Sequence, residues 1–255
     1  MGNESAVYTI LYTIGMYLQI LIRFAPLAVL AFFVLRAIYR RVNARDAQRR
    51  EQNGEGKLPD LGNGGHAVLA GIFLLLYGLP YMLLGLLWYR LFFLEAPLQM
   101  CSFLLPALAG LFLLLRKPRI AVILMTLAAV IVLAGELPEI PRYLEPEGYL
   151  ATYDESIGYT EYIPRQFVAV PILHILTFLL FAAALYLRGK PAEILSFCAA
   201  AAALLYMNQQ LASTAYVTGH PTPLNLLPFF YAVGAIFAGL WRRSLKKTSD
   251  IDSLS

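Results

Sequence analysis

Six polar side chains stand out in this chain because they interrupt stretches that are otherwise almost wholly apolar. Inside a membrane span a charged residue costs about 2.5–3.5 kcal/mol on insertion scales, so each is a candidate for function. All six fall in one half of the predicted spans or at its mouth. We expect them to form a site for a lipid or hydrophobic ligand, made of Arg23, Glu136, His174, Asn208, Gln209 and His220.

The first chemistry that these residue types support is proton transfer and hydrogen bonding. A histidine changes its charge near neutral pH, so His174 suits either role. Glu136 carries the carboxylate, and Arg23 is the opposite charge at similar depth. A structural interpretation stands beside the functional one. In it, His174 donates to a backbone carbonyl, and Arg23 pairs with Glu136 only to hold two helices together.

Three consecutive amides, Asn208, Gln209 and Gln210, lie in a later apolar stretch. At about 100° per residue they fan over about 200° of a helix, so one or two of them must face other helices. Their alternative role is interhelical hydrogen bonding, which contributes about 1 kcal/mol or less per contact in membranes.

The elements that position these residues follow from composition. The chain of 255 residues is 59% hydrophobic and 14% charged, whereas soluble domains are about 45–50% apolar and about 25% charged. We therefore expect an all-α integral membrane protein with a single domain over 1–255. Seven apolar runs are long enough to cross a hydrocarbon core of about 30 Å as helix. They cover about 10–36, 67–88, 98–115, 119–137, 167–187, 192–213 and 222–241.

The basic residues predict the orientation of these seven spans. Sixteen of the 20 Lys and Arg residues follow the first, third, fifth and seventh runs, and the positive-inside rule assigns those segments to the cytoplasm. The N-terminus is then outside, the C-terminus is cytoplasmic, and the six candidate residues lie in the outer half. The composition, rich in Ala and Leu with short loops, favours a bacterial inner membrane.

Two connecting loops have appreciable length. The cytoplasmic loop, 37–65, begins with a charged stretch that predicts a helical extension and ends in a glycine-rich return. The periplasmic loop, 138–166, holds six acidic and two basic residues. It also contains five tyrosines, and tyrosine is enriched at protein interfaces. We therefore expect this loop to bind a partner protein or the membrane surface, or else simply to cap the helix ends. Its candidate partner-binding residues are Tyr143, Tyr149, Tyr153, Tyr159 and Tyr162.

Several function classes do not fit this distribution of polar residues. Polar side chains occupy only the outer half of the spans, so transport by this chain alone is not expected. Haem is not expected either, because His66 lies on the inner side and leaves one pair, His174 and His220. A zinc enzyme wants three ligands and a base at one level, so we expect no metal. The basic residues are explained by topology, and we expect no nucleic-acid partner.

Our first hypothesis is therefore a multi-pass subunit of a larger membrane assembly, without catalysis of its own. Its outer polar site and tyrosine-rich loop would bind a lipid, a hydrophobic ligand or other membrane or periplasmic subunits. The alternative is a quinone-binding anchor of a redox complex. In that case His174 or His220 would bond a quinone oxygen, and Glu136 would pass protons to the periplasm.

Overall fold

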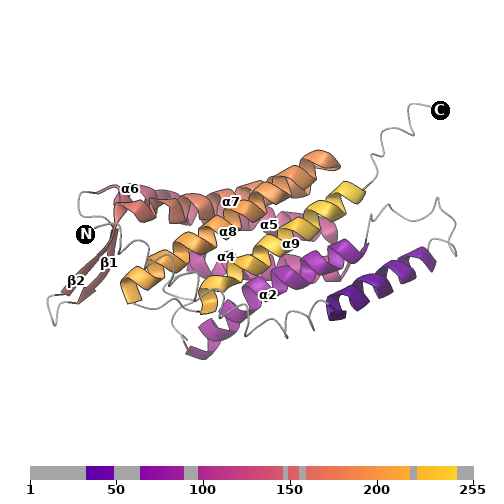
Figure 1. Cartoon of the computed structure of the whole chain (residues 1–255), viewed down its shortest axis with the longest axis horizontal. Coiled ribbons are helices and arrows are strands. Elements are labelled where there is room, and N and C mark those ends of the chain that lie inside the picture. The colour runs from indigo at the N-terminus through magenta and orange to yellow at the C-terminus, as the bar shows by residue number, and fades with distance from the viewer. Residues whose placement is uncertain are drawn as a thin grey trace, which may run out of the picture.

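We describe residues 33–48, 64–88, 97–145, 149–154, 159–218 and 223–245 of a computed structural model, shown whole in Figure 1. This part of the chain is mainly helical. An unlabelled helix over 33–48 comes first. The labelled elements are α2 (Gly64–Trp88), α4 (Pro97–Leu114), α5 (Pro118–Glu136), η1 (Leu137–Glu139), α6 (Ile140–Tyr143), β1 (Tyr149–Asp154), β2 (Tyr159–Ile163), η2 (Arg165–Val168), α7 (Ala169–Tyr186), α8 (Lys190–Thr218), η3 (Pro223–Leu226) and α9 (Leu227–Ser244).

Six of these helices coincide with six of the seven predicted spans, which confirms the helical architecture. The remaining span, 10–36, lies outside the described residues except for its last four. Helices form here because long apolar runs satisfy their backbone groups internally, and proline sets two of the starts. Pro118 in α5 and Pro228 in α9 occupy the first turn, where the missing N–H does no harm.

The six long helices form a closed ring. Each packs against the next in chain order, and α9 returns to pack against α2 (Figure 1). Side chains from all of them meet in one core, whose most deeply buried members include Leu74, Met125, Phe178, Phe181 and Tyr231. A ring of this kind brings α7 and α8 next to each other near the end of α5, which matters for the candidate site.

Four helices of the described part are long and apolar enough to cross a membrane. They comprise Gly64–Leu83, Pro118–Tyr143, Arg165–Tyr186 and Lys190–Thr214, and a shorter apolar stretch covers Met100–Leu114. Their outward faces carry large exposed apolar side chains, among them Ile123 and Val130 on α5 and Ile194 and Leu205 on α8. In water such continuous faces would promote association.

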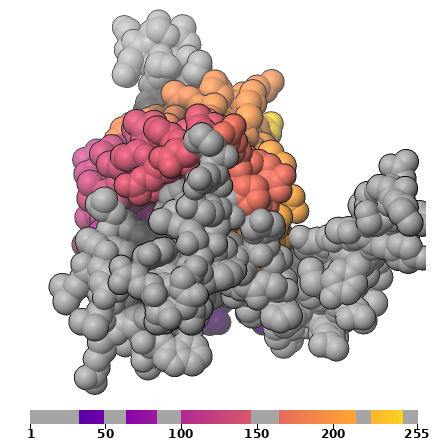
Figure 2. Space-filling model, turned by 90° about the vertical axis from the view of Figure 1, so that its left-hand side faces the viewer, coloured from indigo at the N-terminus to yellow at the C-terminus, as the bar shows by residue number. Residues whose placement is uncertain are grey.

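One end of the ring, which we call the hairpin end, carries the two strands. β1 and β2 pair antiparallel, with Tyr149 opposite Ile163 and Asp154 opposite Tyr159, and an irregularity lies between Leu150 and Thr152. The predicted loop 138–166 thus contains η1, α6 and a hairpin. Figure 2 looks onto this end, where the pink surface of α5 and α6 lies beside the orange surface of α7 and α8.

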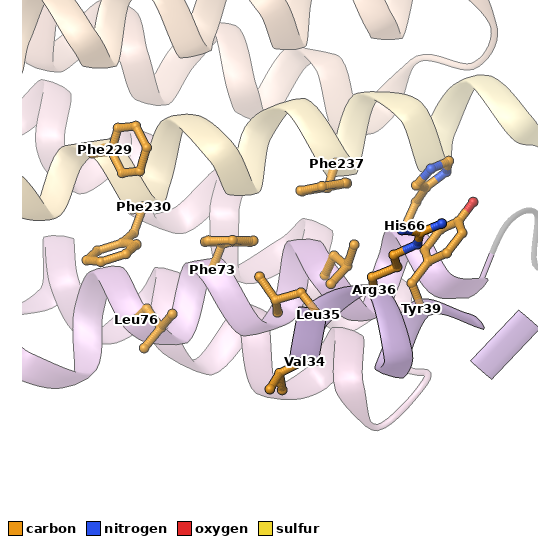
Figure 3. Close-up of a pocket in the computed structure, with 11 residues that line it drawn as sticks. Val34, Leu35, Arg36, Tyr39, His66, Phe73, Leu76, Phe229, Phe230 and Phe237 are labelled. Carbon is orange, nitrogen blue, oxygen red and sulfur yellow. The ribbon is translucent and has the colours of Figure 1, made fainter. Parts of the chain in front are cut away.

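The helix over 33–48 lies alongside α2 and α9. Tyr39 contacts His66 with 5.2 Å between ring centroids, and His66 lies 6.1 Å from the ring of Phe237. Between these three helices is a largely apolar groove, shown in Figure 3. The predicted helical extension of the first span therefore packs along the bundle rather than standing away from it.

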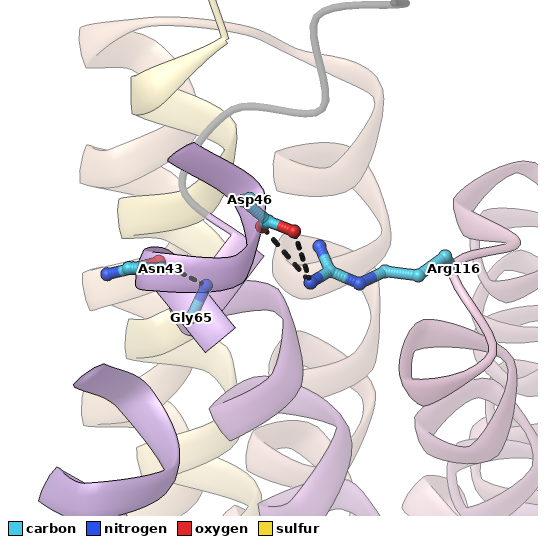
Figure 4. Close-up of polar contacts among 4 residues, drawn as sticks. All are labelled: Asn43, Asp46, Gly65 and Arg116. Atoms are coloured by element: carbon cyan, nitrogen blue, oxygen red, sulfur yellow. Dashed lines mark hydrogen bonds and ion pairs between the residues drawn. The ribbon is translucent and has the colours of Figure 1, made fainter. Parts of the chain in front are cut away.

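The opposite end, the basic end, is held together by polar contacts between segments far apart in sequence. An oxygen of Asp46 lies 3.1 Å from a guanidinium nitrogen of Arg116, and the Gly65 amide donates to Asn43 Oδ1 at 2.9 Å (Figure 4). The Arg243 guanidinium donates to Glu193 at 2.6 Å. These contacts join the helix over 33–48 to α2 and to the turn between α4 and α5, and they join α8 to α9.

The helices α2 and α4 touch through glycine. A Cβ atom built on Gly71 would lie 2.7 Å from the carbonyl oxygen of Gly110, and one on Gly110 would lie 2.5 Å from the carbonyl oxygen of Gly71. Real Cβ atoms do not approach backbone oxygens so closely. Small residues at a helix contact allow backbones to come together in this way, so this crossing point depends on both glycines.

Candidate functional site

The candidate site is centred on a hydrogen bond between Glu136, at the end of α5, and His174, in the second turn of α7. His174 Nδ1 lies 2.6 Å from Glu136 Oε1. The imidazole is buried, with 6% of its side chain exposed, whereas the carboxylate is 31% exposed. An ionised carboxylate can only accept hydrogen bonds, so the Nδ1–H group donates to Glu136. The pair thus connects the interior of the bundle to its surface.

Aromatic rings enclose His174 on the other sides. Tyr206 of α8 stacks on the imidazole at 4.6 Å with an angle of 4° between the ring planes. Phe178, one turn further along α7, presents its ring at 83° and 5.2 Å. Together these contacts fix the plane of the imidazole, and therefore the direction in which its second nitrogen points.

The aromatic contacts continue from His174 into the core. Phe178 lies 5.0 Å from Tyr231 of α9, which meets Tyr77 of α2 edge-on at 5.1 Å. Tyr77 is followed by Phe103 of α4 at 5.4 Å. The site is therefore the outer end of a buried aromatic column that crosses the ring of helices.

The second nitrogen of His174, Nε2, is buried and has no hydrogen-bond partner among the described residues. In a neutral imidazole with hydrogen on Nδ1, Nε2 is an acceptor, and in the imidazolium it is a donor. A buried polar atom left unpaired costs about 1–3 kcal/mol. The site can therefore accept a hydrogen bond from a hydroxyl group or donate one to a carbonyl oxygen, with the hydrogen supplied or removed through Glu136.

The structure brings together two of the six predicted ligand-binding residues. Glu136 and His174 are in direct contact. Asn208 is exposed and Gln209 is half-buried on α8, and within the described part of the chain neither bonds to the pair. Arg23 and His220 lie outside the described residues, so their roles, and the pairing of Arg23 with Glu136, stay predictions.

One structural alternative is corrected by this geometry. A structural His174 was expected to donate to a backbone carbonyl, but its Nδ1 bonds to the Glu136 carboxylate instead. The physical reason is position. Glu136 ends α5 beside the second turn of α7, within reach of the imidazole. The side chain that donates to an α7 carbonyl is that of Thr177, whose hydroxyl bonds to the carbonyl oxygen of Leu173 at 2.8 Å.

Four of the five predicted partner-binding tyrosines lie on the hairpin. Tyr149 and Tyr153 belong to β1, and Tyr159 and Tyr162 to β2. The fifth, Tyr143, ends α6 and is half-buried. Four aromatic residues on two paired strands form one short, locally folded unit at the hairpin end, whose side-chain positions lie outside the described part.

Sequence reasoning missed the aromatic residues of the site. Tyr206, Tyr77 and Tyr231 are buried and lie within apolar runs. A tyrosine in a membrane protein is usually expected near an interface, so tyrosines well inside a run were an available signal. The candidate site residues were chosen for charged, amide or imidazole side chains, so these largely apolar tyrosines were not among them.

The described residues contain no group of three or more His, Cys, Asp or Glu side chains placed to hold a metal ion. Searches against protein-family models, curated proteins and solved structures find no match to this chain.

Proposed function

We propose that this chain is an integral membrane protein that crosses the bilayer seven times and serves as a non-catalytic subunit of a larger assembly in a bacterial inner membrane. Its N-terminus would lie outside and its C-terminus in the cytoplasm. The four long apolar helices and the exposed apolar side chains on their outward faces support insertion. The basic residues gathered at the end opposite the hairpin support this orientation.

The function that the geometry favours is binding of a hydrophobic ligand, lipid or partner that carries one hydrogen-bonding group. The unpartnered Nε2 of His174 is the observation that carries this proposal. A histidine used only for packing gains from having both nitrogens satisfied, because each unpaired buried atom costs about 1–3 kcal/mol. A bound hydroxyl or carbonyl group in the imidazole plane would recover that free energy.

The test replaces His174 by phenylalanine, which keeps the ring contacts and removes both nitrogens. Mass spectrometry of a chloroform–methanol extract of the purified protein should then lack a compound that the unaltered protein retains in stoichiometric amount. Thr177→Val, one turn deeper on α7, is the matched control and should retain the compound. Identical extracts from the unaltered and His174→Phe proteins would remove His174 from any binding role.

A second candidate function is a quinone-binding anchor of a redox complex, and one observation favours it. A quinone site must receive a hydrogen bond from a quinol hydroxyl and give one to a quinone carbonyl, and Nε2 can do both as the imidazole changes protonation state. Oxidation of a quinol to a quinone releases two protons and two electrons. The two protons would leave in turn: Nε2 would take a hydroxyl proton, Nδ1 would pass its proton to Glu136, and Glu136 would release it outside. The imidazole would return to its Nδ1–H tautomer before the second transfer. The electrons would go to a redox centre of a partner subunit.

This candidate is tested with short-chain ubiquinone and menaquinone analogues added to the purified protein. Binding that changes the redox difference spectrum, and that Glu136→Gln and His174→Phe both weaken at least tenfold, would support it. Equal binding by all three proteins would leave the ligand-binding subunit as the only candidate.

The tyrosines of the hairpin are the proposed contact with a periplasmic partner, together with Tyr143. Tyrosine is enriched at protein interfaces, and a paired hairpin presents several together. Replacing the four strand tyrosines with serine should remove a co-purifying subunit. The same change at the exposed Tyr186, near the basic end, is the control and should leave the complex intact.

The orientation has its own test. Single cysteines at Gly54 and Ser156, positions outside the described residues, are introduced after Cys101 and Cys198 are changed to serine. In intact spheroplasts an impermeant thiol reagent should label the cysteine at 156 and spare the cysteine at 54. The reverse pattern would invert the topology, and with it the side on which the His174 site opens.

A further inference from the structure

A second site lies far from His174, between the helix over 33–48, α2 and α9. It is a groove of about 660 Å³, within the range of about 300–1,000 Å³ typical of ligand pockets. Aromatic and aliphatic side chains line almost all of it, including Phe73 and Leu76 from α2 and Phe230 and Phe237 from α9 (Figure 3). The proposed function makes no use of this groove.

Polar side chains gather at one end of the groove only. Arg36, Tyr39 and His66 lie together there, toward the basic end of the bundle (Figure 3). His66 Nδ1 is buried without a hydrogen-bond partner among the described residues. Arg36 is exposed and forms no ion pair within the described part of the chain. This end can therefore supply a positive charge and a hydrogen-bond donor to an anion.

The charge around that end is one-sided. The helix over 33–48 carries four arginines, Arg36, Arg40, Arg41 and Arg45, against one acid. The acid, Asp46, is already paired with Arg116. Basic pockets between membrane helices on the cytoplasmic side are places where anionic headgroups bind.

The length of the groove points to the type of occupant. From His66 to Leu76 along α2 the rise is about 15 Å at about 1.5 Å per residue. That is half of the hydrocarbon core of about 30 Å, the depth that the acyl chains of one leaflet occupy. A polar end followed by one leaflet's depth of apolar lining matches a phospholipid better than a compact small molecule.

We propose that this groove holds one anionic phospholipid from the leaflet at the basic end. An acyl chain lies along Phe73, Leu76 and Phe237, and the phosphate is bound by Arg36 and His66. The inference rests on the membrane insertion proposed above, and it is independent of the His174 site. A free phosphate would leave the apolar lining uncovered, and a lipid without net negative charge would leave the charge of Arg36 uncompensated.

Native mass spectrometry of the full chain in neutral detergent tests the proposal, with phosphatidylglycerol and phosphatidylcholine of the same acyl chains as probes. One copy of phosphatidylglycerol should bind in preference to phosphatidylcholine. Arg36→Gln should weaken phosphatidylglycerol binding about fivefold, the contribution of one basic residue near an anionic surface. It should weaken phosphatidylcholine binding less, because choline already balances the charge of that lipid's phosphate. Arg45→Gln, on the same helix but outside the groove lining, is the matched control and should change binding less than twofold.

A second pair of variants tests the acyl part of the site. Leu76→Trp fills the apolar end of the groove and should weaken binding of both lipids, whereas Leu79→Trp, an exposed α2 residue outside the lining, should weaken neither. Equal effects of Arg36→Gln and Arg45→Gln would show general surface attraction and overturn the proposal. Unchanged binding in Leu76→Trp, or equal affinity for the two lipids, would also overturn it. His174→Phe should bind phosphatidylglycerol normally, so failure at one site is distinguishable from failure at the other.

Discussion

The two ends of the helical ring differ in how their polar side chains are bonded. At the basic end, two ion pairs join segments that are far apart in sequence, Asp46 with Arg116 and Arg243 with Glu193. At the other end, the bond between Glu136 and His174 leaves Nε2 of the imidazole without a partner among the residues that the structure describes. The ion pairs hold the basic end together, whereas Nε2 of His174 is the atom to which the proposed function assigns a ligand.

Burial explains why this difference has energetic consequences. The side chain of Arg243 is 51% exposed and that of Glu193 is 16% exposed, and ion pairs that stay in contact with water contribute about 0–1 kcal/mol. His174 is almost wholly buried, so its polar atoms have no water to replace a lost partner. Variants at the hairpin end should therefore have larger effects than equivalent variants at the basic end.

The largest effect should come from Glu136→Leu, which leaves His174 Nδ1 unpaired. We expect a loss of about 1–3 kcal/mol in the free energy of unfolding, or about 2–4 °C in thermal midpoint per kcal/mol for a chain of this size. Thermal denaturation of the purified protein in detergent measures it. Glu193→Leu at the basic end is the control, and a control loss as large as that of Glu136→Leu would contradict the comparison.

Double-mutant cycles sharpen the same contrast. Glu136→Gln and His174→Phe should show a coupling energy above about 1 kcal/mol, within the range for residues in contact. The cycle of Asp46→Asn and Arg116→Gln should give less than about 1 kcal/mol, as partly exposed pairs do. Strictly additive effects at the hairpin end would mean that the Glu136–His174 bond contributes nothing to stability.

Tyr206→Leu should have an intermediate effect. It removes the ring stacked on His174, and aromatic pairs contribute about 0.5–1.5 kcal/mol beyond their buried area. The same denaturation assay measures the loss, and ligand retention should fall because the imidazole is no longer held in one plane. Leu205→Ala, the adjacent exposed residue, should change stability by less than about 0.5 kcal/mol.

The smallest effect should come from Arg116→Gln. It breaks the ion pair with Asp46, whose side chains are both partly exposed, so the expected loss is below about 1 kcal/mol. Retention of the ligand at the His174 site should be unchanged. A loss of ligand in this variant would show that the two ends are coupled through the bundle, contrary to the comparison.

The positions of the helices could be predicted from the sequence because a helix satisfies the backbone groups of a long apolar segment within that segment. Each long apolar run therefore predicts one helix. The run predicted at 119–137, for example, is α5 over Pro118–Glu136. The runs also placed Glu136 and His174 in the same half of the spans, and the structure joins them, although the predicted partner of Glu136 was Arg23.

Helix rotation is what the apolar runs leave open. Tyr206 and Asn208 are two residues apart, which is about 200° around a helix, so only one of them can face the core. Polarity favoured Asn208, yet Asn208 is exposed and Tyr206 is buried against His174. The nearly uniform apolar surface of α8 gives no face preference that a sequence pattern could report. The hairpin in the loop 138–166 depends on local strand pairing, which the apolar runs do not predict.

The contact between Gly71 and Gly110 has a consequence for how relatives of this chain should be interpreted. At that point any side chain on one helix would meet the backbone of the other, so selection for folding alone is enough to keep both positions glycine. In a future set of homologues they would appear invariant, as reactive residues do, without taking part in any reaction. His174 and Glu136 would differ, because under the proposed function they would vary together wherever a lineage had lost the ligand.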